Sequence, residues 1–158
     1  MIEIRAATAA LAGRQATWVA ALEPWRSLGY QSAGLSRFLR RVAGGGGVLA
    51  AIETSAPGRP GRVAGVVAMQ EGVLLGNFVS LLAVRAEAAR QGIGRALMAA
   101  VEARTPPRRW LYVSADAGNA GALGFYRKLG FKRVGRLPDL VRQGHVELLL
   151  RKAVPRPA

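Results

Sequence analysis

A glycine-containing tetrapeptide, Gln91-Gly92-Ile93-Gly94, stands where a strand ending near Val84 gives way to a helix. Glycines let a ligand approach the backbone closely, and the first N–H groups of a helix have no partners inside it. The helix dipole adds partial positive charge at that end, and the cationic residues Arg90 and Arg95 flank the glycines. This combination predicts a site for an anion such as a phosphate group.

Two common nucleotide sites do not fit this segment. A P-loop requires Gly-Lys-Ser or Gly-Lys-Thr, which the segment lacks. The dinucleotide fingerprint requires Gly or Ala where Leu97 stands, and an acidic residue about 20 positions further on, where the chain has Tyr112 with only Asp116 nearby. The run Gly44–Gly47 is not a phosphate loop either, because it leads from a predicted helix into a predicted strand.

A second segment makes the interpretation more specific. Residues 119–131 read Asn-Ala-Gly-Ala-Leu-Gly-Phe-Tyr-Arg-Lys-Leu-Gly-Phe and follow a predicted strand. They resemble the second motif of the GNAT superfamily of N-acetyltransferases, Asn-x-x-Ala-x-x-Phe-Tyr-x-Lys-x-Gly-Phe. Residues 89–94 resemble that family's acyl-CoA-binding motif, Arg/Gln-x-x-Gly-x-Gly/Ala. Its first position is Ala89 here, and Arg90 substitutes for the missing polar side chain. The resemblance extends over about residues 2–151.

The resemblance implies direct transfer of the acetyl group of acetyl-CoA, as co-substrate, to a primary amine, with no metal ion. It implies that the strand edge near Val84 pairs with the pantetheine arm and supplies an N–H to the oxyanion. The amides of Gln91–Arg95 then bind the pyrophosphate, Asn119 contacts the cofactor, and Tyr126 is the general acid. The implied cofactor-binding residues are Leu82, Ala83, Val84, Arg90, Gln91, Gly92, Ile93, Gly94, Arg95, Asn119 and Tyr126.

The catalytic base is less well defined. The strand Asn77–Val84 carries no glutamate, and the carboxylates expected nearest the cleft are Asp116, Asp139 and Glu147. Strand alternation places His145 and Glu147 on one face of the closing strand and three aliphatic side chains on the other. We predict that Glu147 is the base and that His145 belongs to the substrate site. The alternatives are that both are ordinary rim residues and that solvent takes the proton.

The acceptor amine is constrained by the loop Pro24–Tyr30 and by the small number of acids. In this family the loop region shapes the acceptor site, so Trp25 and Tyr30 are expected to line it; the alternative is that the tryptophan anchors the core. Only 9 residues are acidic, which disfavours polyamine or aminoglycoside acceptors. A single amine on a neutral or anionic small molecule, or a peptide amine, fits better.

Hydrophobic periodicity predicts the elements that hold these residues. We predict a mixed α/β fold with a mostly antiparallel central sheet and helices on both faces, in the order β-α-α-β-β-β-α-β-α-β-β. The predicted strands are 2–5, 48–52, 63–69, 73–84, 111–113, 132–136 and 146–150. The predicted helices are 11–22, 32–43, 93–105 and 119–129, the last with Ala122, Phe125 and Leu129 facing inward. We also predict a tight turn at Glu71-Gly72 and a bulge at Gly76-Asn77.

Composition sets wider limits. The chain has 158 residues, 51% hydrophobic and 20% charged, which predicts one globular domain over residues 1–152 and a loose tail over 153–158. The absence of cysteine excludes disulfides, thiol catalysis and cysteine-ligated metals, while the single histidine leaves a Ser–His–Asp triad possible on count alone. We see no signal peptide, and Gly72–Val84 is too short to span a bilayer, so we expect a cytoplasmic protein without a membrane partner.

The charge is strongly basic, with 23 Lys and Arg against 9 acidic residues, a net +14. Such a surface attracts polyanions, so a nucleic-acid-binding module is an alternative function. No aromatic-basic motif or recognition-helix pattern accompanies the charge, and we therefore expect no specific nucleic-acid partner. A second alternative is a GNAT-fold protein that binds CoA without catalysis. A homodimer is left open.

Overall fold

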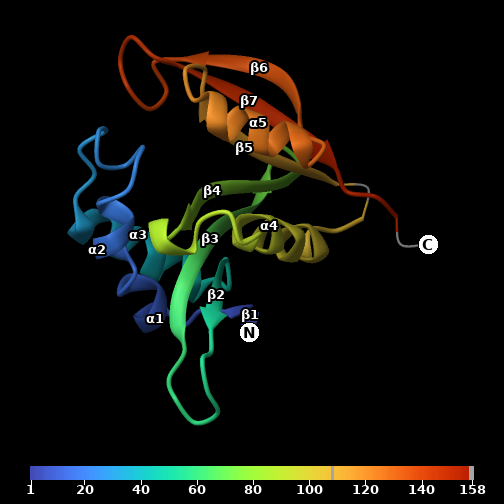
Figure 1. Cartoon of the computed structure of the whole chain (residues 1–158). Coiled ribbons are helices and arrows are strands. Elements are labelled where there is room, and N and C mark those ends of the chain that lie inside the picture. Colours follow the sequence, from blue (N-terminus) through green and yellow to red (C-terminus); the bar gives the residue numbers. More distant parts are fainter. Residues whose placement is uncertain (108, 157–158) are drawn as a thin grey trace. The chain divides into compact units, whose positions relative to one another are not determined.

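The computed structural model describes residues 1–107 and 109–156 (Figure 1). The strands are β1 Ile2–Ala6, β2 Val48–Glu53, β3 Arg62–Val73, β4 Gly76–Val84, β5 Trp110–Asp116, β6 Lys132–Pro138 and β7 Val146–Ala153. They form a seven-stranded sheet in the order β1-β2-β3-β4-β5-β7-β6. The pairs β1–β2, β2–β3, β5–β7 and β6–β7 are antiparallel, and β4–β5 is parallel. The prediction of a mixed, mostly antiparallel sheet is confirmed.

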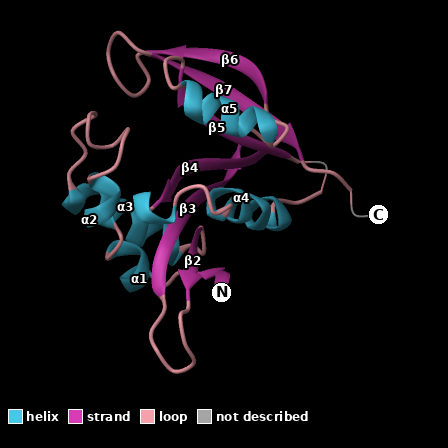
Figure 2. Ribbon diagram, in the orientation of Figure 1, coloured by secondary structure: helices cyan, strands magenta, loops and turns pink. Residues whose placement is uncertain are grey.

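The helices are coloured in Figure 2, and a 3-10 turn, Ala86–Ala88, follows β4. They are α1 Ala9–Gly13, α2 Ala16–Ala20, α3 Ser32–Gly44, α4 Ile93–Arg104 and α5 Ala120–Lys128. The prediction of one helix over 11–22 is wrong, because α1 and α2 divide that stretch. Gly13 lies at the division, where an added Cβ would be 2.5 Å from Nε of Arg40 on α3. The Gln15 side chain bridges the break, donating to the Leu11 carbonyl at 2.8 Å and accepting from Trp18 Nε1 at 2.9 Å.

The chain packs as two compact units, each with its own buried residues. The first unit comprises Met1–Gln70 and Leu81–Ala103, and the second comprises Glu71–Ser80 and the residues from Arg104 onward. The single domain over residues 1–152 stays a prediction.

Apolar helix faces form much of the core of the first unit. From the sequence we expect Leu35, Phe38, Leu39 and Val42 on one face of α3, and Ile93, Leu97 and Val101 on one face of α4. All are buried except Phe38 and Val42, which are partly buried against the core. Spacing of three and four residues puts each set on one side of its helix. Helices α1, α2 and α3 lie together beside β2 (Figure 2).

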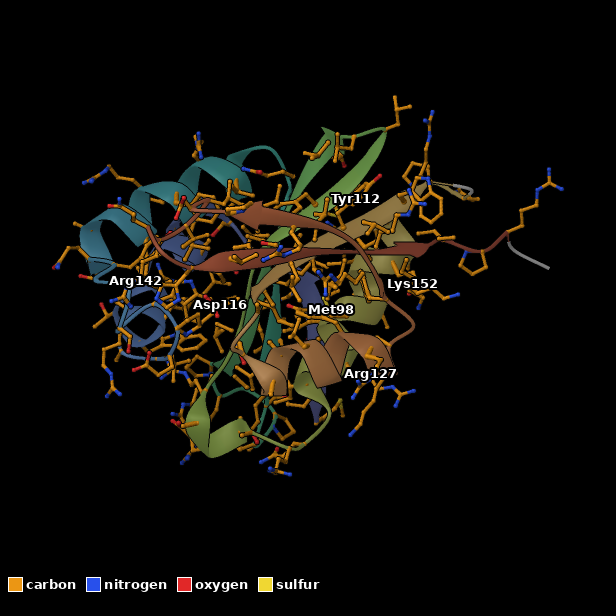
Figure 3. All side chains as sticks on the ribbon, turned by 90° about the horizontal axis from the view of Figure 1, so that it is seen from above. Met98, Tyr112, Asp116, Arg127, Arg142 and Lys152 are labelled. Carbon is orange, nitrogen blue, oxygen red and sulfur yellow. The ribbon has the colours of Figure 1, made fainter. Side chains whose placement is uncertain are left out.

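In the second unit, α5 lies across one face of β5 and β7 (Figures 1 and 3). The helix ends in a Schellman motif. The Gly130 N–H donates to the Arg127 carbonyl at 3.0 Å, and the Phe131 N–H donates to the Tyr126 carbonyl at 3.1 Å. Gly130 has a φ of +96°, the left-handed conformation in which glycine carries no Cβ penalty. The Schellman motif therefore accounts for the glycine directly after the helix.

The inward side of α5 differs from the prediction. Tyr126 is buried, whereas Ala122, Phe125 and Leu129 are only half-buried. The Schellman motif returns Phe131 onto the helix, and its ring centroid lies 5.6 Å from that of Tyr126. Tyr126, the predicted general acid, is therefore the residue that is buried on α5.

The turn between β3 and β4 is also displaced from its predicted place. Strand β3 continues through Glu71 and Gly72, and the chain reverses at Leu74 and Leu75, with φ of +49° and +59°. Two left-handed residues suit a two-residue hairpin, but such turns ordinarily carry Asn or Gly, so two leucines gave no signal. Tyr112 Oη donates to the Leu74 carbonyl at 3.3 Å and ties this turn to β5.

Among the described residues, the β4–β5 ladder has no bulge at the predicted position, Gly76-Asn77. Gly76 pairs with Trp110 and Asn77 with Leu111 in regular register. Glycine is needed for close approach instead, since an added Cβ at Gly76 would lie 2.1 Å from the Trp110 carbonyl oxygen.

The C-terminal boundary lies later than expected. Strand β7 includes Ala153, and Val154 is buried with its N–H bonded to the Arg109 carbonyl at 2.9 Å. Residues 157 and 158 of the predicted tail lie outside the described residues. Within residues 1–107 and 109–156, none of the helices has the length and apolar character needed to cross a bilayer.

Candidate active site

The loop entering α4 presents a row of backbone donors. The Ala96 N–H bonds to the Gly92 carbonyl at 2.9 Å, so Gly92 caps the helix and Ile93 begins it. In the part of the chain that the structure describes, the N–H groups of residues 91–95 have no hydrogen-bond partner. Gln91, Gly92 and Arg95 are exposed, and Gly94 is half-buried. Unpaired N–H groups at a helix N-terminus are the geometry of an anion site.

This loop has an unusual backbone. Arg90 has a φ of +61° and Gly92 a φ of +77°. Left-handed backbone is uncommon outside glycine and marks a constrained segment. An added Cβ at Gly92 would meet open space, so the backbone conformation rather than crowding requires glycine here. Open space above Gly92 is also what a ligand approaching the amides needs.

A glycine on β3 sets how closely α4 approaches the sheet. An added Cβ at Gly65 would lie 2.9 Å from Ile93 Cγ2 and 3.1 Å from both the Ala83 carbonyl oxygen and Leu97 Cδ1. Only glycine leaves room for the first turn of α4 at that distance. The anion loop is thus held by packing beneath it within the first unit.

An arginine fixes the end of β4 that leads into this loop. Arg85 Nε donates to the Val63 carbonyl at 2.7 Å, and its guanidinium lies 4.6 Å from the centroid of the Trp18 ring. Burial lowers the pKa of the Arg85 guanidinium, and the nearby charge of Arg62 lowers it further. Arg62 in turn forms an ion pair with Glu87 of the 3-10 turn. Trp18 and Arg85 therefore hold this end of β4 in place.

Strand β4 carries the residues predicted to contact the cofactor through its backbone. Leu82 and Val84 are half-buried on one face, while Leu81 and Ala83 are buried on the other. The parallel register with β5 covers Gly76–Val79, and β4 continues to Val84. In the described chain, residues 81–84 have no ladder partner on the β5 side. The side chain of Ala83 is buried, so this residue could contact a ligand only through its backbone.

Helix α5 positions Asn119 and Tyr126. Asn119 is the N-cap, its Oδ1 accepting from the Ala122 N–H at 3.1 Å. The Tyr126 ring packs edge-on against Phe125 and Phe131, with centroids at 5.2 and 5.6 Å. Burial raises the pKa of Tyr126 to about 12. Its hydroxyl has no partner among the described residues and is not among the fully buried atoms without one, so the oxygen is accessible.

Strands β5 and β7 bring four polar side chains together on one face. Asp116 pairs directly with Glu147, and Ser114 and His145 each lie two residues away on the same side. His145 Nδ1 lies 3.0 Å from Asp116 Oδ2, and the Ser114 hydroxyl bonds to the Glu147 carboxylate. Figure 3 labels Asp116 at the end of β5, toward Arg142 and away from Tyr112.

The two carboxylates have opposite environments. Burial raises the pKa of Glu147, the negative charge of Asp116 raises it further, and the Ser114 hydrogen bond opposes both. The Gly118 N–H, which donates to Asp116 Oδ1 at 2.7 Å, is the main cause of a lowered pKa of Asp116, and His145 assists. Glu147 Oε2 is buried and has no hydrogen-bond partner in the described structure.

This geometry resolves two other readings of the polar residues. A Ser–His–Asp triad is not assembled, because the Ser114 hydroxyl bonds to Glu147 while His145 bonds to Asp116. Over residues 1–107 and 109–156, no group of three or more His, Cys, Asp and Glu residues is arranged to hold a metal ion. The cluster is suited to moving protons.

Of the other predicted site residues, Asp139 and Trp25 make structural contacts, and Tyr30 is exposed. Asp139 has a φ of +57° and its Oδ1 accepts from the Gly144 N–H at 2.7 Å, so it shapes the β6–β7 loop. Trp25 is half-buried against the core of the first unit, and its carbonyl accepts from the Tyr30 N–H at 3.0 Å. Tyr30 is 46% exposed. Their contact with an acceptor stays a prediction.

Sequence reasoning missed the Asp116–His145 pair. The predicted strand 111–113 stopped too early, whereas β5 runs to Asp116 and pairs along its length with β7. Alternation along the longer strand places Ser114 and Asp116 on the same face. This could have been predicted from the sequence if the end of the strand had been known.

Comparison with known proteins agrees with this arrangement. The sequence matches the family model of an acetyltransferase (GNAT) domain over residues 53–146. No curated protein sequence matches it.

Solved structures share the fold at low sequence identity. A GNAT-family acetyltransferase from Bacillus cereus has a TM-score of 0.75 at 15% identity, covering 99% of this chain and 99% of its own. Arabidopsis thaliana NAA60 in complex with acetyl-CoA has a TM-score of 0.76 at 21% identity, covering 96% and 98%. The ribosomal-protein-S18-alanine N-acetyltransferase of Escherichia coli has a TM-score of 0.65 at 18% identity, covering 100% and 97%. With more than half of its length matched by the family model, the chain belongs to the GNAT family of acetyltransferases.

Proposed function

We propose that the protein is an N-acetyltransferase that transfers the acetyl group of acetyl-CoA to a primary amine. The observation that supports this most is the row of unpaired N–H groups at residues 91–95, preceded by the left-handed Arg90 and containing the left-handed Gly92. These residues are contiguous in sequence, and Gln91, Gly92 and Arg95 are exposed. The related NAA60 structure contains acetyl-CoA, which supports the same co-substrate here.

The residues of the first unit fit the phosphate end of this co-substrate. The five amides of residues 91–95 would hold the pyrophosphate, and the side chains of Arg90 and Arg95 add positive charge. The unpaired edge of β4 at Leu82 and Val84 would bond to the pantetheine arm as a further strand would. In the second unit, Asn119 Oδ1 is occupied by its cap, which leaves the side-chain amide N–H groups to donate.

The chemical step needs a donor at the thioester oxygen, a proton for the departing sulfur and an acceptor for a proton from the amine. Acetyl-CoA, when bound, supplies the thioester that the amine attacks. The backbone N–H near Val84 would stabilise the charge that develops on oxygen. Tyr126 would donate its phenolic proton to sulfur, and its raised pKa keeps it protonated throughout the physiological range. A protonated amine loses two protons in all. Glu147 would take the first before the nitrogen attacks, and the second would pass from the nitrogen to the Tyr126 phenolate left after sulfur is protonated, so the proton count balances.

The acceptor we propose is a single amine on a neutral or anionic small molecule, or a peptide amine. The Escherichia coli relative is named for acetylating an alanine of a ribosomal protein, which supports the peptide class. His145, Trp25 and Tyr30 are the residues proposed to contact the acceptor.

A CoA-release assay tests this function. Purified protein is incubated with acetyl-CoA and each member of a panel of free peptide α-amines and small monoamines, and thiol release and product mass are measured. We expect at least one class of amine to be acetylated faster than acetyl-CoA is hydrolysed in its absence. Binding of acetyl-CoA with no product from any amine would favour the non-catalytic alternative. Nucleic-acid binding without acetyl-CoA binding would favour the nucleic-acid module.

A further inference from the structure

One buried oxygen on the polar face of the second unit has no explained partner. The Ser114 hydroxyl interacts with the Glu147 carboxylate, yet Glu147 Oε2 is buried without a hydrogen bond in the described structure. A buried carboxylate oxygen that accepts nothing is costly, and in native proteins such atoms commonly serve a ligand or a reaction. An amine N–H is a donor that would satisfy it.

Asp116, the residue paired with Glu147 on β5, has hydrogen bonds to both of its carboxylate oxygens. Both oxygens of Asp116 are engaged, Oδ1 by the Gly118 N–H at 2.7 Å and Oδ2 by His145 Nδ1 at 3.0 Å. Asp116 and Glu147 are directly paired in the β5–β7 register, so their side chains leave the same face of the sheet at adjacent positions. The structure therefore fixes one negative charge beside a second carboxylate.

We propose that Asp116 and His145 form a positioning pair for Glu147, in which the Asp116 carboxylate, held by His145, favours transfer of the acceptor amine's proton to Glu147. This inference rests on the proposed function. The step is R–NH₃⁺ plus the Glu147 carboxylate giving R–NH₂ plus the Glu147 carboxylic acid, with no other reactant. The negative charge of Asp116 makes the protonated form of Glu147 more favourable, which is what a base requires.

The charged groups around Glu147 make the direction of the effect testable. On β5 these are Asp116 and the hydrogen-bonding Ser114, and His145 stands immediately before β7, bonded to Asp116. On β6 the residue paired with Glu147 is the uncharged Leu137, and the cation of Arg142 in the β6–β7 loop acts on Asp116. Removing Asp116 and removing Ser114 must therefore shift the pKa of Glu147 in opposite directions.

The first measurement needs no acceptor. The pKa of Glu147 is followed by carbon-13 NMR of protein labelled at glutamate side-chain carboxyls, with Glu147→Gln identifying the signal. We expect Asp116→Asn to lower the pKa, because a negative neighbour is lost while the carbonyl that accepts from Gly118 is kept. We expect Ser114→Ala to raise it, because a donor to the carboxylate is lost. An unchanged value in Asp116→Asn would overturn the proposal.

The second measurement links the pair to turnover. With the best acceptor from the amine panel, the acid limb of the kcat/KM profile should move to lower pH in Asp116→Asn and to higher pH in Ser114→Ala. His145→Leu should lower kcat with little change in the KM of acetyl-CoA, and His145→Asn, which keeps a donor near the Nδ1 position, should restore most of it. A general structural defect would not give opposite shifts.

The outcomes separate the two proposals. If Glu147→Gln loses about 10²–10⁴-fold of kcat/KM but the Asp116→Asn profile overlays the wild type, Glu147 is the base and the positioning pair is wrong. If the Glu147→Gln profile itself overlays the wild type, the base assignment fails and the positioning pair fails with it. Unfolding temperatures and acetyl-CoA affinity identify any variant that has merely lost its fold.

Discussion

Tyr126 and Glu147 owe their chemistry to burial. The phenol is packed between Phe125 and Phe131, and the carboxylate lies partly out of solvent beside Asp116. In both cases burial raises the pKa, which keeps Tyr126 a proton donor and makes Glu147 a stronger base than an exposed glutamate. Burial would thus suit Tyr126 to donate a proton and Glu147 to accept one.

Tyr126→Phe should lower kcat by about 10²–10⁴-fold while leaving acetyl-CoA affinity and the fold intact, because only the proton donor is removed. The matched control is Tyr112→Phe, which removes another largely buried hydroxyl of the second unit. That hydroxyl bonds to the Leu74 carbonyl, so the control should lose about 0.5–1.5 kcal/mol of stability and keep its turnover. Steady-state kinetics and thermal unfolding measure both. Normal turnover in Tyr126→Phe would remove Tyr126 from the mechanism.

Glu147→Gln should become more stable relative to the wild type as pH rises. The pKa of the Glu147 carboxyl is raised in the folded state above its ordinary value of 4.5. The folded protein therefore holds this proton at pH values where the unfolded chain has lost it, and wild-type stability falls as pH rises from about 4.5 through the raised pKa. Unfolding temperatures at pH 4, 5.5 and 7 test this.

The control for that experiment is Glu71→Gln, which removes one charge from an exposed residue of the same unit. A difference between Glu147→Gln and wild type that stays constant over this pH range would contradict a perturbed Glu147.

At the scale of elements, α5 depends on its two ends. Asn119 caps the first turn, and the Schellman motif at Gly130 returns Phe131 onto Tyr126. The residues responsible are neighbours in sequence, and for that reason both ends were predictable. The helix that carries Tyr126, the proposed general acid, is thereby fixed by local interactions.

Gly130→Ala should destabilise the protein by about 1–2 kcal/mol, because φ of +96° is unfavourable for a residue with a Cβ. Gly124→Ala lies inside the same helix, where an added Cβ meets open space, and should stabilise by about 0.5–1 kcal/mol. Denaturant unfolding measures both. Equal effects of the two substitutions would show that the Schellman motif is not what holds this end of α5.

Elements that depend on contacts distant in sequence were harder to predict. At the break between α1 and α2, Gly13 lies against the Arg40 side chain of α3. The turn at Leu74-Leu75 is stabilised by Tyr112, far along the chain. The end of β5 is set by its pairing with β7. Each correction thus reports a tertiary contact that overrides local preference.

At the scale of the whole chain, the two recognised motifs belong to different compact units. The anion loop at residues 91–95 is in the first unit, and Asn119 and Tyr126 are in the second. Each motif was predictable because its spacing is local. The Asp116–His145 pair was not, because it depends on the register between two strands separated in sequence by a helix and a strand.

The net charge of +14 complicates any test of specific binding, because a basic surface attracts every polyanion. A specific site must therefore be separated from general attraction by a substitution that changes the site alone. Gly92 and Gly58 offer such a pair, since both have left-handed backbone, at φ of +77° and +80°, and open space above Cα. Replacing either by glutamate adds the same charge and the same backbone strain.

The most direct test of the central claim is thermal unfolding against acetyl-CoA concentration. A ligand that binds only the folded state stabilises it by about 2.7 kcal/mol at 100 times its Kd. We predict a saturating rise in unfolding temperature for the wild type and for Gly58→Glu, and none for Gly92→Glu, whose charged side chain would occupy the pyrophosphate position. No rise in the wild type, an equal rise with heparin, or an equal rise in Gly92→Glu would contradict acetyl-CoA binding at the start of α4.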